Sequence, residues 1–213
     1  MENERIARIA GLVREYTNCE KCKKLCANRK KITWASDRLD SKIVVVESHP
    51  NEEGEASDTS LGGIERDYLN RILRGSGIDP SWVYVTTTVL CRPQGRQPTV
   101  REQRNCFDRL SVEIEVIDPI LVVVMGHSAA KIMLNVGSKF ASTAKHADAP
   151  FMEVSTRGVR GDVKRNAILT FSLKDIREKE GCIPLTKGSH TEWVVKAFKR
   201  AKSILDCYAE LYG

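Results

Sequence analysis

Apolar residues recur along the chain with two spacings, and segments of the two kinds alternate. A return of apolar residues every three or four positions predicts helices at 4–16, 63–73, 100–117, 126–134 and 191–211. Short runs rich in β-branched residues predict strands at 42–47, 82–89, 120–125 and 167–171. Because helices separate the strands, they should pair in parallel through right-handed crossovers. We expect an α/β fold: a three-layer α/β/α sandwich around a central, mostly parallel four-stranded sheet.

One domain accounts for residues 1–213. This length suffices for one sizeable core, and no repeat, low-complexity tract or Gly/Ser-rich linker divides it. No apolar run reaches the roughly 18 residues of a membrane span. The first residues, Met1–Arg5, lack the features of a signal peptide. We expect a cytoplasmic protein that has no contact with a membrane and, with no obligate protein partner evident, is a monomer.

Charge and cysteine content add to this picture. The net charge is +6, from 34 basic and 28 acidic residues. The excess is consistent with nucleic acid as a partner, but it does not establish one. Seven cysteines are present. In a reducing compartment an odd number argues against a disulfide framework, so a grouped subset is better explained by metal or cluster ligation.

Four cysteines stand where they can share one metal site. Cys19 and Cys22 follow the first predicted helix, and Cys91 ends the second predicted strand, fifteen positions before Cys106. Four thiolates can hold a cubane iron–sulfur cluster or a tetrahedral zinc ion. The alternative is that the first pair are free thiols and the second pair are packed in the core.

The sequence after Cys91 favours the cluster, because it closely resembles a signature of the family 4 uracil-DNA glycosylases. It reads Cys-Arg-Pro-Gln-Gly-Arg-Gln-Pro-Thr, followed by Glu102 and Cys106. The early segment 19–29 and the apolar strand at 120–125 also look like that family, so the resemblance covers most of the chain. It implies a uracil-DNA glycosylase-like fold, DNA as a partner, and an N-terminal segment that binds a 4Fe–4S cluster. The implied ligands are Cys19, Cys22, Cys91 and Cys106.

Three cysteines lie outside this ligand set. Cys26 could replace Cys22 as a ligand, although the family spacing favours Cys22. Cys182 and Cys207 are expected to be structural or incidental.

The resemblance also places a catalytic site at the carboxyl ends of the strands, where this sequence departs from the family. Glu47 matches the carboxylate of the family's Gly-Glu-Ala-Pro-Gly motif, whose two glycines are absent here. Such a carboxylate can orient water or stabilise a developing oxocarbenium ion; otherwise it merely caps the strand. Leu61 stands where the family stacks uracil on Phe, and Thr87 where its Asn reads the base. Ser172 replaces the His that supports the leaving base.

Two hypotheses follow from these changes. In the leading one, the chain is a DNA glycosylase that hydrolyses the N-glycosidic bond of a flipped non-standard pyrimidine and leaves an abasic site. A modified base is favoured over plain uracil, and repair, viral replication and antiviral defence stay open as settings. The catalytic residues are then Glu47 and Ser172, and the base pocket is formed by Ser48, His49, Leu61 and Thr87. The alternative is a catalytically inactive iron–sulfur DNA-binding protein of the same fold.

The residues predicted to contact DNA lie around the same strand ends. They are Arg92, Arg96, His127, Ser128 and Lys174. For the two arginines, ordinary surface positions are equally consistent with the sequence. The Gly- and Arg-rich segment 157–161 is predicted to be a solvated loop, with a mobile DNA-contacting loop as the alternative.

Overall fold

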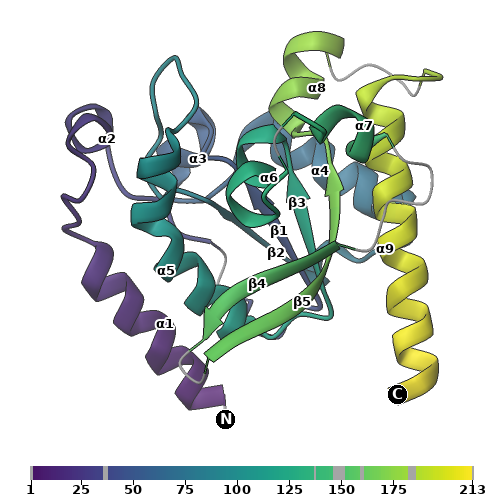
Figure 1. Ribbon diagram of the computed structural model, residues 1–213, viewed down its shortest axis with the longest axis horizontal. Coiled ribbons are helices and arrows are strands. Elements are labelled where there is room, and N and C mark those ends of the chain that lie inside the picture. Colours follow the sequence, from purple (N-terminus) through teal and green to yellow (C-terminus); the bar gives the residue numbers. More distant parts are fainter. Residues whose placement is uncertain are drawn as a thin grey trace.

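One five-stranded sheet forms the centre of the described part of the chain (Figure 1). This computed structural model describes residues 2–35, 38–136, 138–145, 152–158, 161–181 and 186–212. Four neighbouring strands are parallel, in the order β2 (Val83–Thr87), β1 (Ile43–Glu47), β3 (Leu121–Met125) and β5 (Gly161–Thr170). At the edge, β4 (Met152–Gly158) pairs antiparallel with β5. The four parallel strands therefore all end on one side of the sheet.

Helices cover both faces of this sheet (Figure 1). On one face, α4 (Gly63–Gly75) packs against α9 (His190–Tyr212). On the other, α5 (Val100–Ile117) packs against α1 (Glu2–Tyr16) and α6 (His127–Met133). The shorter helices are α2 (Lys23–Asn28), α3 (Glu52–Ser57), α7 (Phe140–Ala144) and α8 (Leu173–Glu180), and a 3₁₀ turn, Pro80–Trp82, leads into β2. Among the helices described, none is both long and apolar enough to cross a membrane.

The predicted three-layer α/β/α fold is confirmed, but the sheet has one strand more than predicted. The missed strand, β4, lies at the edge of the sheet and has a largely polar sequence, as edge strands often do. It therefore lacks the run of apolar residues by which the other strands were predicted. The prediction of a loop at 157–161 was wrong at its flanks. Residues 157–158 end β4 and Gly161 begins β5, while residues 159–160 lie outside the described residues.

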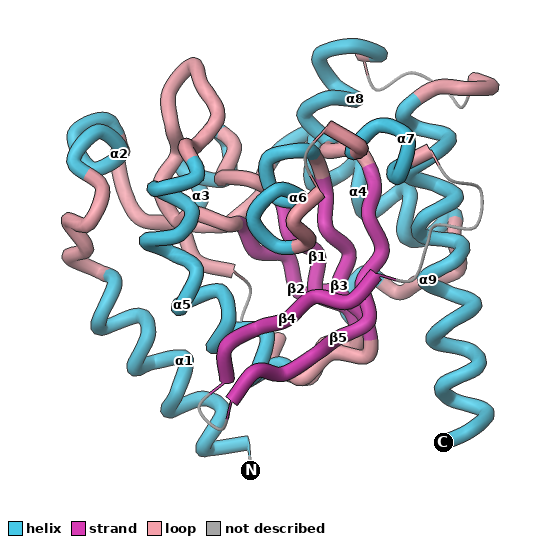
Figure 2. The backbone as a smooth tube through the Cα atoms, in the orientation of Figure 1, coloured by secondary structure: helices cyan, strands magenta, loops and turns pink. Residues whose placement is uncertain are grey.

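The long loop between β2 and α5 stands above α5, between α2 and α3 (Figure 2). Two side chains fix it there. Gln94 donates from Nε2 to the carbonyl of Asn28 at 2.8 Å, and Arg92 Nε lies 2.9 Å from Glu55 of α3. The loop therefore joins the N-terminal segment to the carboxyl ends of the strands.

A buried ion pair attaches α5 to the end of β2. Arg109 and Glu113 are both almost fully buried, and Arg109 Nη1 lies 2.8 Å from Glu113 Oε2. Arg109 also donates to the Thr86 hydroxyl at 3.0 Å and to the Thr87 carbonyl at 2.7 Å. The Thr86 hydroxyl itself donates to Glu113 at 2.7 Å. These bonds compensate two charges that would otherwise be costly to bury.

Removing one partner of this pair should destabilise the fold strongly. Arg109→Met leaves the Glu113 carboxylate buried without its cation, which costs about 3–5 kcal/mol in such pairs. We expect urea unfolding to show a loss of this size. The double variant Arg109→Met/Glu113→Leu should recover most of it, and Arg104→Met, at an exposed position of the same helix, should change little. Equal losses in the single and double variants would contradict the role given to this pair.

Candidate functional site

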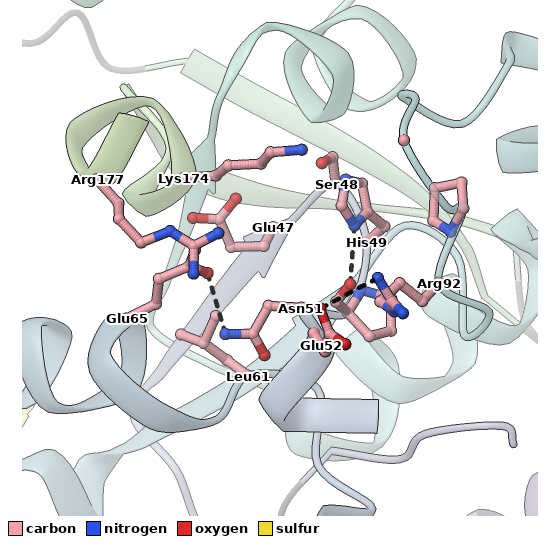
Figure 3. Close-up of a pocket in the computed structure, with 13 residues that line it drawn as sticks. Glu47, Ser48, His49, Asn51, Glu52, Leu61, Glu65, Arg92, Lys174 and Arg177 are labelled. Carbon is pink, nitrogen blue, oxygen red and sulfur yellow. Dashed lines mark hydrogen bonds and ion pairs between the residues drawn. The ribbon is translucent and has the colours of Figure 1, made fainter. Parts of the chain in front are cut away.

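A small cavity opens at the carboxyl end of β1 (Figure 3). Its walls come from residues 47–52, from Leu61 and Glu65 around the start of α4, from the loop after β2 and from α8. Its volume is about 100 Å³, which is room for roughly three water molecules at about 30 Å³ each. This suits one ring-sized group, since sites for larger ligands measure several hundred Å³.

Glu47 is a buried acid in the wall of this cavity. It is the last residue of β1, its exposed fraction is 5%, and its Oε1 accepts a hydrogen bond from Leu173 N at 2.9 Å. Burial raises the pKa of Glu47 to about 8, and the nearby acids Glu65 and Asp175 act in the same direction. The Leu173 N–H opposes the shift. Glu47 therefore holds its proton at neutral pH and loses it in the mildly alkaline range.

Ser172 is the N-cap of α8, and the next residue, Leu173, donates its backbone N–H to Glu47. The Ser172 hydroxyl accepts from Asp175 N at 3.0 Å and so caps the helix. Gly126 lets the end of β3 approach this cap closely. It has φ +84°, and a Cβ there would lie 2.9 Å from Ser172 Cβ. Ser172 thus supports Glu47 through the helix, and its own hydroxyl is already engaged.

Asn51 holds the floor of the cavity together. Its Oδ1 accepts from Gly54 N at 2.8 Å and from Gly62 N at 2.9 Å. Its Nδ2 donates to the Gly62 carbonyl at 2.7 Å and to Glu65 at 3.2 Å. Because these bonds fix the chain on both sides of Leu61, they determine where that buried side chain meets the cavity.

Three cationic side chains line the cavity, together with the acids Glu47, Glu52 and Glu65. Arg177 Nε lies 3.2 Å from Glu65, whose carboxylate is buried, and Arg92 Nε lies 2.9 Å from Glu55. Lys174 is the third cation of the lining. In the view of Figure 3, Arg92 and Arg177 stand on opposite sides, with Lys174 between them. The arrangement suits an anionic ligand whose neutral part enters the cavity.

His49 lies in the wall as a neutral ring. Its Nδ1 lies 2.8 Å from the Pro50 carbonyl. Burial lowers the pKa of His49 to about 4, and the cations Lys174 and Arg92 act in the same direction. The imidazole is therefore uncharged throughout the physiological range.

The structure brings six of the predicted site residues to this cavity: Glu47, Ser48, His49, Leu61, Arg92 and Lys174. The reasoning from sequence missed Asn51 and Glu65. Asn51 had a usable signal, because an Asn directly before Glu52 and Glu53 is a typical helix N-cap. Glu65 had none, since its burial depends on Arg177 of a distant helix.

Other predicted residues lie apart from the cavity lining. The Thr87 hydroxyl is buried and donates to the Val89 carbonyl at 2.8 Å. Arg96 makes two bonds of 2.7 Å to Glu102. His127 is exposed, with its ring 5.4 Å from that of Phe140, and the Ser128 hydroxyl accepts from Gln103 at 3.1 Å.

The four predicted ligand cysteines lie in one region. Cys22, Cys91 and Cys106 are buried together with Leu25 and Val89. Cys19 is partly buried against a second cluster that contains Tyr16, and its carbonyl accepts from Arg29 Nη1 at 2.7 Å. Side-chain nitrogens face the sulfurs. Arg29 Nη1 lies 3.4 Å from Cys91 Sγ and 3.1 Å from Cys26 Sγ, and Asn105 Nδ2 lies 3.3 Å from Cys22 Sγ.

This donor set fits a sulfur-ligated cluster, because N–H groups directed at ligand sulfurs are typical of such sites. Among the described residues, no three Cys, His, Asp or Glu side chains already stand close enough to hold a single metal ion. Cys207 is exposed, and Cys182 lies outside the described residues.

Comparison with known proteins places this site in a family. The family model of the uracil DNA glycosylase superfamily matches residues 35–211. A type-4 uracil-DNA glycosylase of Thermotoga maritima is 34% identical over 63% of this chain and 68% of its own length. The type-4 enzyme of Archaeoglobus fulgidus is 27% identical, over 69% and 74% respectively. A type-5 enzyme of Pyrobaculum aerophilum is 32% identical over 42% of this chain and 38% of its own length.

The chain therefore belongs to the uracil-DNA glycosylase superfamily. Within that superfamily it is a family 4 protein, a DNA glycosylase and hence a hydrolase. The family and enzyme class predicted from the cysteine signature are confirmed.

The raised pKa of Glu47 should appear in the stability of the protein. The folded pKa of about 8 lies above the ordinary value of 4.5, so between these two values the folded state binds more protons than the unfolded state. The stabilisation from this group is complete below pH 4.5 and is lost as pH rises toward 8. Glu47→Gln keeps an acceptor for Leu173 and cannot ionise. The difference in unfolding free energy between wild type and this variant should therefore fall across that window and then level off. A flat difference would show that Glu47 has an ordinary pKa.

Proposed function

We propose that this glycosylase hydrolyses the N-glycosidic bond of a flipped, non-standard pyrimidine and leaves an abasic site. The observation that carries this proposal is a buried acid, Glu47, in a cavity of ring size whose lining includes three cations. A flipped nucleotide has the matching form, with a neutral base that enters the cavity and phosphates that stay outside. A modified base is favoured over plain uracil, because Leu61 stands in the wall in place of a stacking phenylalanine and the Asn51 amide is already bonded to Gly54, Gly62 and Glu65.

In this proposal Glu47 is the catalytic base. The bond between the base and C1′ breaks with its electron pair going to the base, and the oxygen of a water molecule bonds to C1′. The ionised Glu47 takes the proton of that water and stabilises the positive charge that develops on the sugar. Because the acid is protonated at neutral pH, only a fraction of the molecules is active there.

The cations of the lining would hold the DNA. Arg92, Lys174 and Arg177 come from two segments on different sides of the cavity, so they can contact phosphates on both sides of the flipped nucleotide. Such contacts would make DNA affinity fall as salt is added. The cytoplasmic location and the monomeric state expected from the sequence stay predictions.

We further propose that Cys19, Cys22, Cys91 and Cys106 hold a 4Fe–4S cluster. In this chain the cluster would have a structural role. It would tie the segment after α1 to the loop that starts at Cys91, and that loop carries Arg92, Pro93 and Gly95 into the cavity wall. The cluster would therefore shape one side of the base pocket without taking part in the reaction.

Replacing a ligand cysteine should remove the cluster. We expect Cys→Ser variants at positions 19, 22, 91 and 106 to lose the brown colour and the absorbance at about 400 nm of a cubane cluster. Cys207→Ser, at an exposed position, should keep both. Cys26→Ser decides between the two candidates for the second ligand: it should keep the cluster if Cys22 binds iron. A colourless wild-type protein that contains zinc would contradict the cluster.

Activity is tested by formation of abasic sites in DNAs that carry uracil, hypoxanthine, 5-hydroxymethyl pyrimidines or glucosylated bases. We expect cleavage of a pyrimidine substrate, with kcat/KM rising with pH to a plateau above about 8, the pKa of Glu47. Glu47→Ala and Glu47→Gln should abolish it, whereas Glu210→Gln, at an exposed position of α9, should not.

Two outcomes would contradict parts of this proposal. A rate that falls as pH rises would exclude Glu47 as a base. If all substrates stay intact while DNA binding persists, the chain is the inactive DNA-binding protein that its changed pocket residues also allow.

A further inference from the structure

Glu55 is a buried carboxylate that joins two segments far apart in the sequence. It belongs to α3 and is 1% exposed. Its Oε1 accepts a hydrogen bond from Lys30 N at 2.9 Å, and its Oε2 accepts one from Arg92 Nε at 2.9 Å. Of these three residues, Arg92 alone lines the cavity. One oxygen of the carboxylate therefore holds a side chain of the cavity wall, and the other is bonded to the N-terminal part of the chain.

The N-terminal partner of Glu55 lies in the segment 28–33, which is itself fixed beside the loop after β2. Thr33 donates to the Leu90 carbonyl twice, from its backbone N–H at 3.1 Å and from its hydroxyl at 3.2 Å. Arg29 Nη1 lies 3.4 Å from Cys91 Sγ. Because these bonds lie before and after Lys30, its N–H has a defined place from which it supports the Glu55 carboxylate.

The bond to Glu55 engages only the inner nitrogen of the Arg92 guanidinium. The outer nitrogen Nη1 lies 3.9 Å from Glu52, whose side chain is 71% exposed, and Figure 3 shows these two residues together at the cavity. A solvated ion pair of this kind contributes little. A guanidinium is planar and presents its donors as a fixed fork. Fixing Nε therefore sets the direction of Nη1 and Nη2, which can exchange Glu52 for another anion.

We propose that Glu55 is a positioning residue, which holds Arg92 Nε so that Nη1 and Nη2 contact a DNA phosphate beside the flipped nucleotide. This inference rests on the part of the proposed function that assigns DNA phosphates to Arg92. The physical gain is that an arginine side chain, which has many rotamers in solvent, is ordered before DNA arrives. Less conformational entropy is then lost when the complex forms.

The sign of one change separates positioning from simple charge. Glu55→Gln removes a negative charge close to a cation that binds DNA, and by charge alone DNA should then bind more tightly. The glutamine amide has one acceptor oxygen, so it cannot accept from both Lys30 N and Arg92 Nε. If Glu55 positions Arg92, DNA should bind more weakly although the protein has become more basic.

The test measures the affinity for a duplex with one tetrahydrofuran abasic nucleotide, which cannot be cleaved, at several salt concentrations. Glu55→Gln and Arg92→Gln should each weaken binding by about tenfold, the lower end for a hydrogen bond to a charged group. Each should also reduce the slope of log K against log salt by about 0.9, the value for one phosphate contact. The double variant should bind no more weakly than Arg92→Gln, because Glu55 acts through Arg92.

Asp58→Asn is the matched control. Asp58 follows α3 and lies 2.8 Å from Lys31 Nζ, so this pair joins the same two segments, but its carboxylate is 66% exposed. The variant removes the same charge, and asparagine tolerates the left-handed conformation of this position, φ +57°. It should bind DNA within about twofold of the wild type, as expected for a surface pair. All variants should keep the absorbance of the cluster, which shows that the cysteine region is folded.

The inference is overturned if Glu55→Gln binds DNA as tightly as the wild type or more tightly, or if its loss adds in full to that of Arg92→Gln. It is also overturned if Glu55→Gln loses the cluster absorbance together with affinity, because Glu55 then supports the fold in general. Failure of the proposed reaction gives a different result. In that case no base-bearing DNA yields abasic sites, while the affinities of the variants still follow the expected order.

Discussion

The hydrogen bond from Leu173 N–H to the Glu47 carboxyl is the contact on which the arrangement of the site depends. It joins the end of β1 to the first turn of α8, two segments far apart in the sequence. A carboxyl group buried this deeply needs a donor, and a helix N-terminus supplies one that no other backbone group uses. The helix is held in turn by the Ser172 cap and by the close approach that Gly126 permits. Lys174 and Arg177 reach the cavity because α8 starts at this point.

The other side of the cavity is held by side-chain hydrogen bonds from Asn51 and Arg92. Asn51 joins α3 to the segment that carries Leu61, because its amide oxygen accepts from Gly54 N and from Gly62 N. The loop after β2 is attached to α3 through Arg92 and Glu55. Each wall is thus held by polar bonds between short elements, and the sheet beneath them supplies the rigid base.

The sequence predicted the parts of the structure that apolar periodicity determines. The bounds of α5 were predicted correctly from its apolar residues, and the structure shows that a capping box of Thr99 and Glu102 fixes its start. β4 and α8 were missed because they contain few apolar residues and are defined by their partners in the fold. The same distinction holds for the site residues. Glu47, Ser48 and His49 follow a buried strand directly, whereas Glu65 becomes part of the cavity only through contacts with Arg177 and Asn51.

The sequence analysis predicted that this chain departs from the family motifs around Glu47. In the structure, two of the residues concerned, Ser172 and His49, lie close to this buried acid or support it. Ser172, predicted from the sequence to stand at the family's histidine position, caps α8, and this helix supports the buried acid Glu47. His49 supplies a neutral ring whose Nδ1 lies 2.8 Å from the Pro50 carbonyl. Burial opposes charge on both Glu47 and His49, and the three cations of the lining are each paired with a carboxylate: Arg92 with Glu55, Arg177 with Glu65 and Lys174 with Glu178. The centre of the cavity is therefore kept free of charge by burial, and the polar bonds that hold its walls are made at its rim.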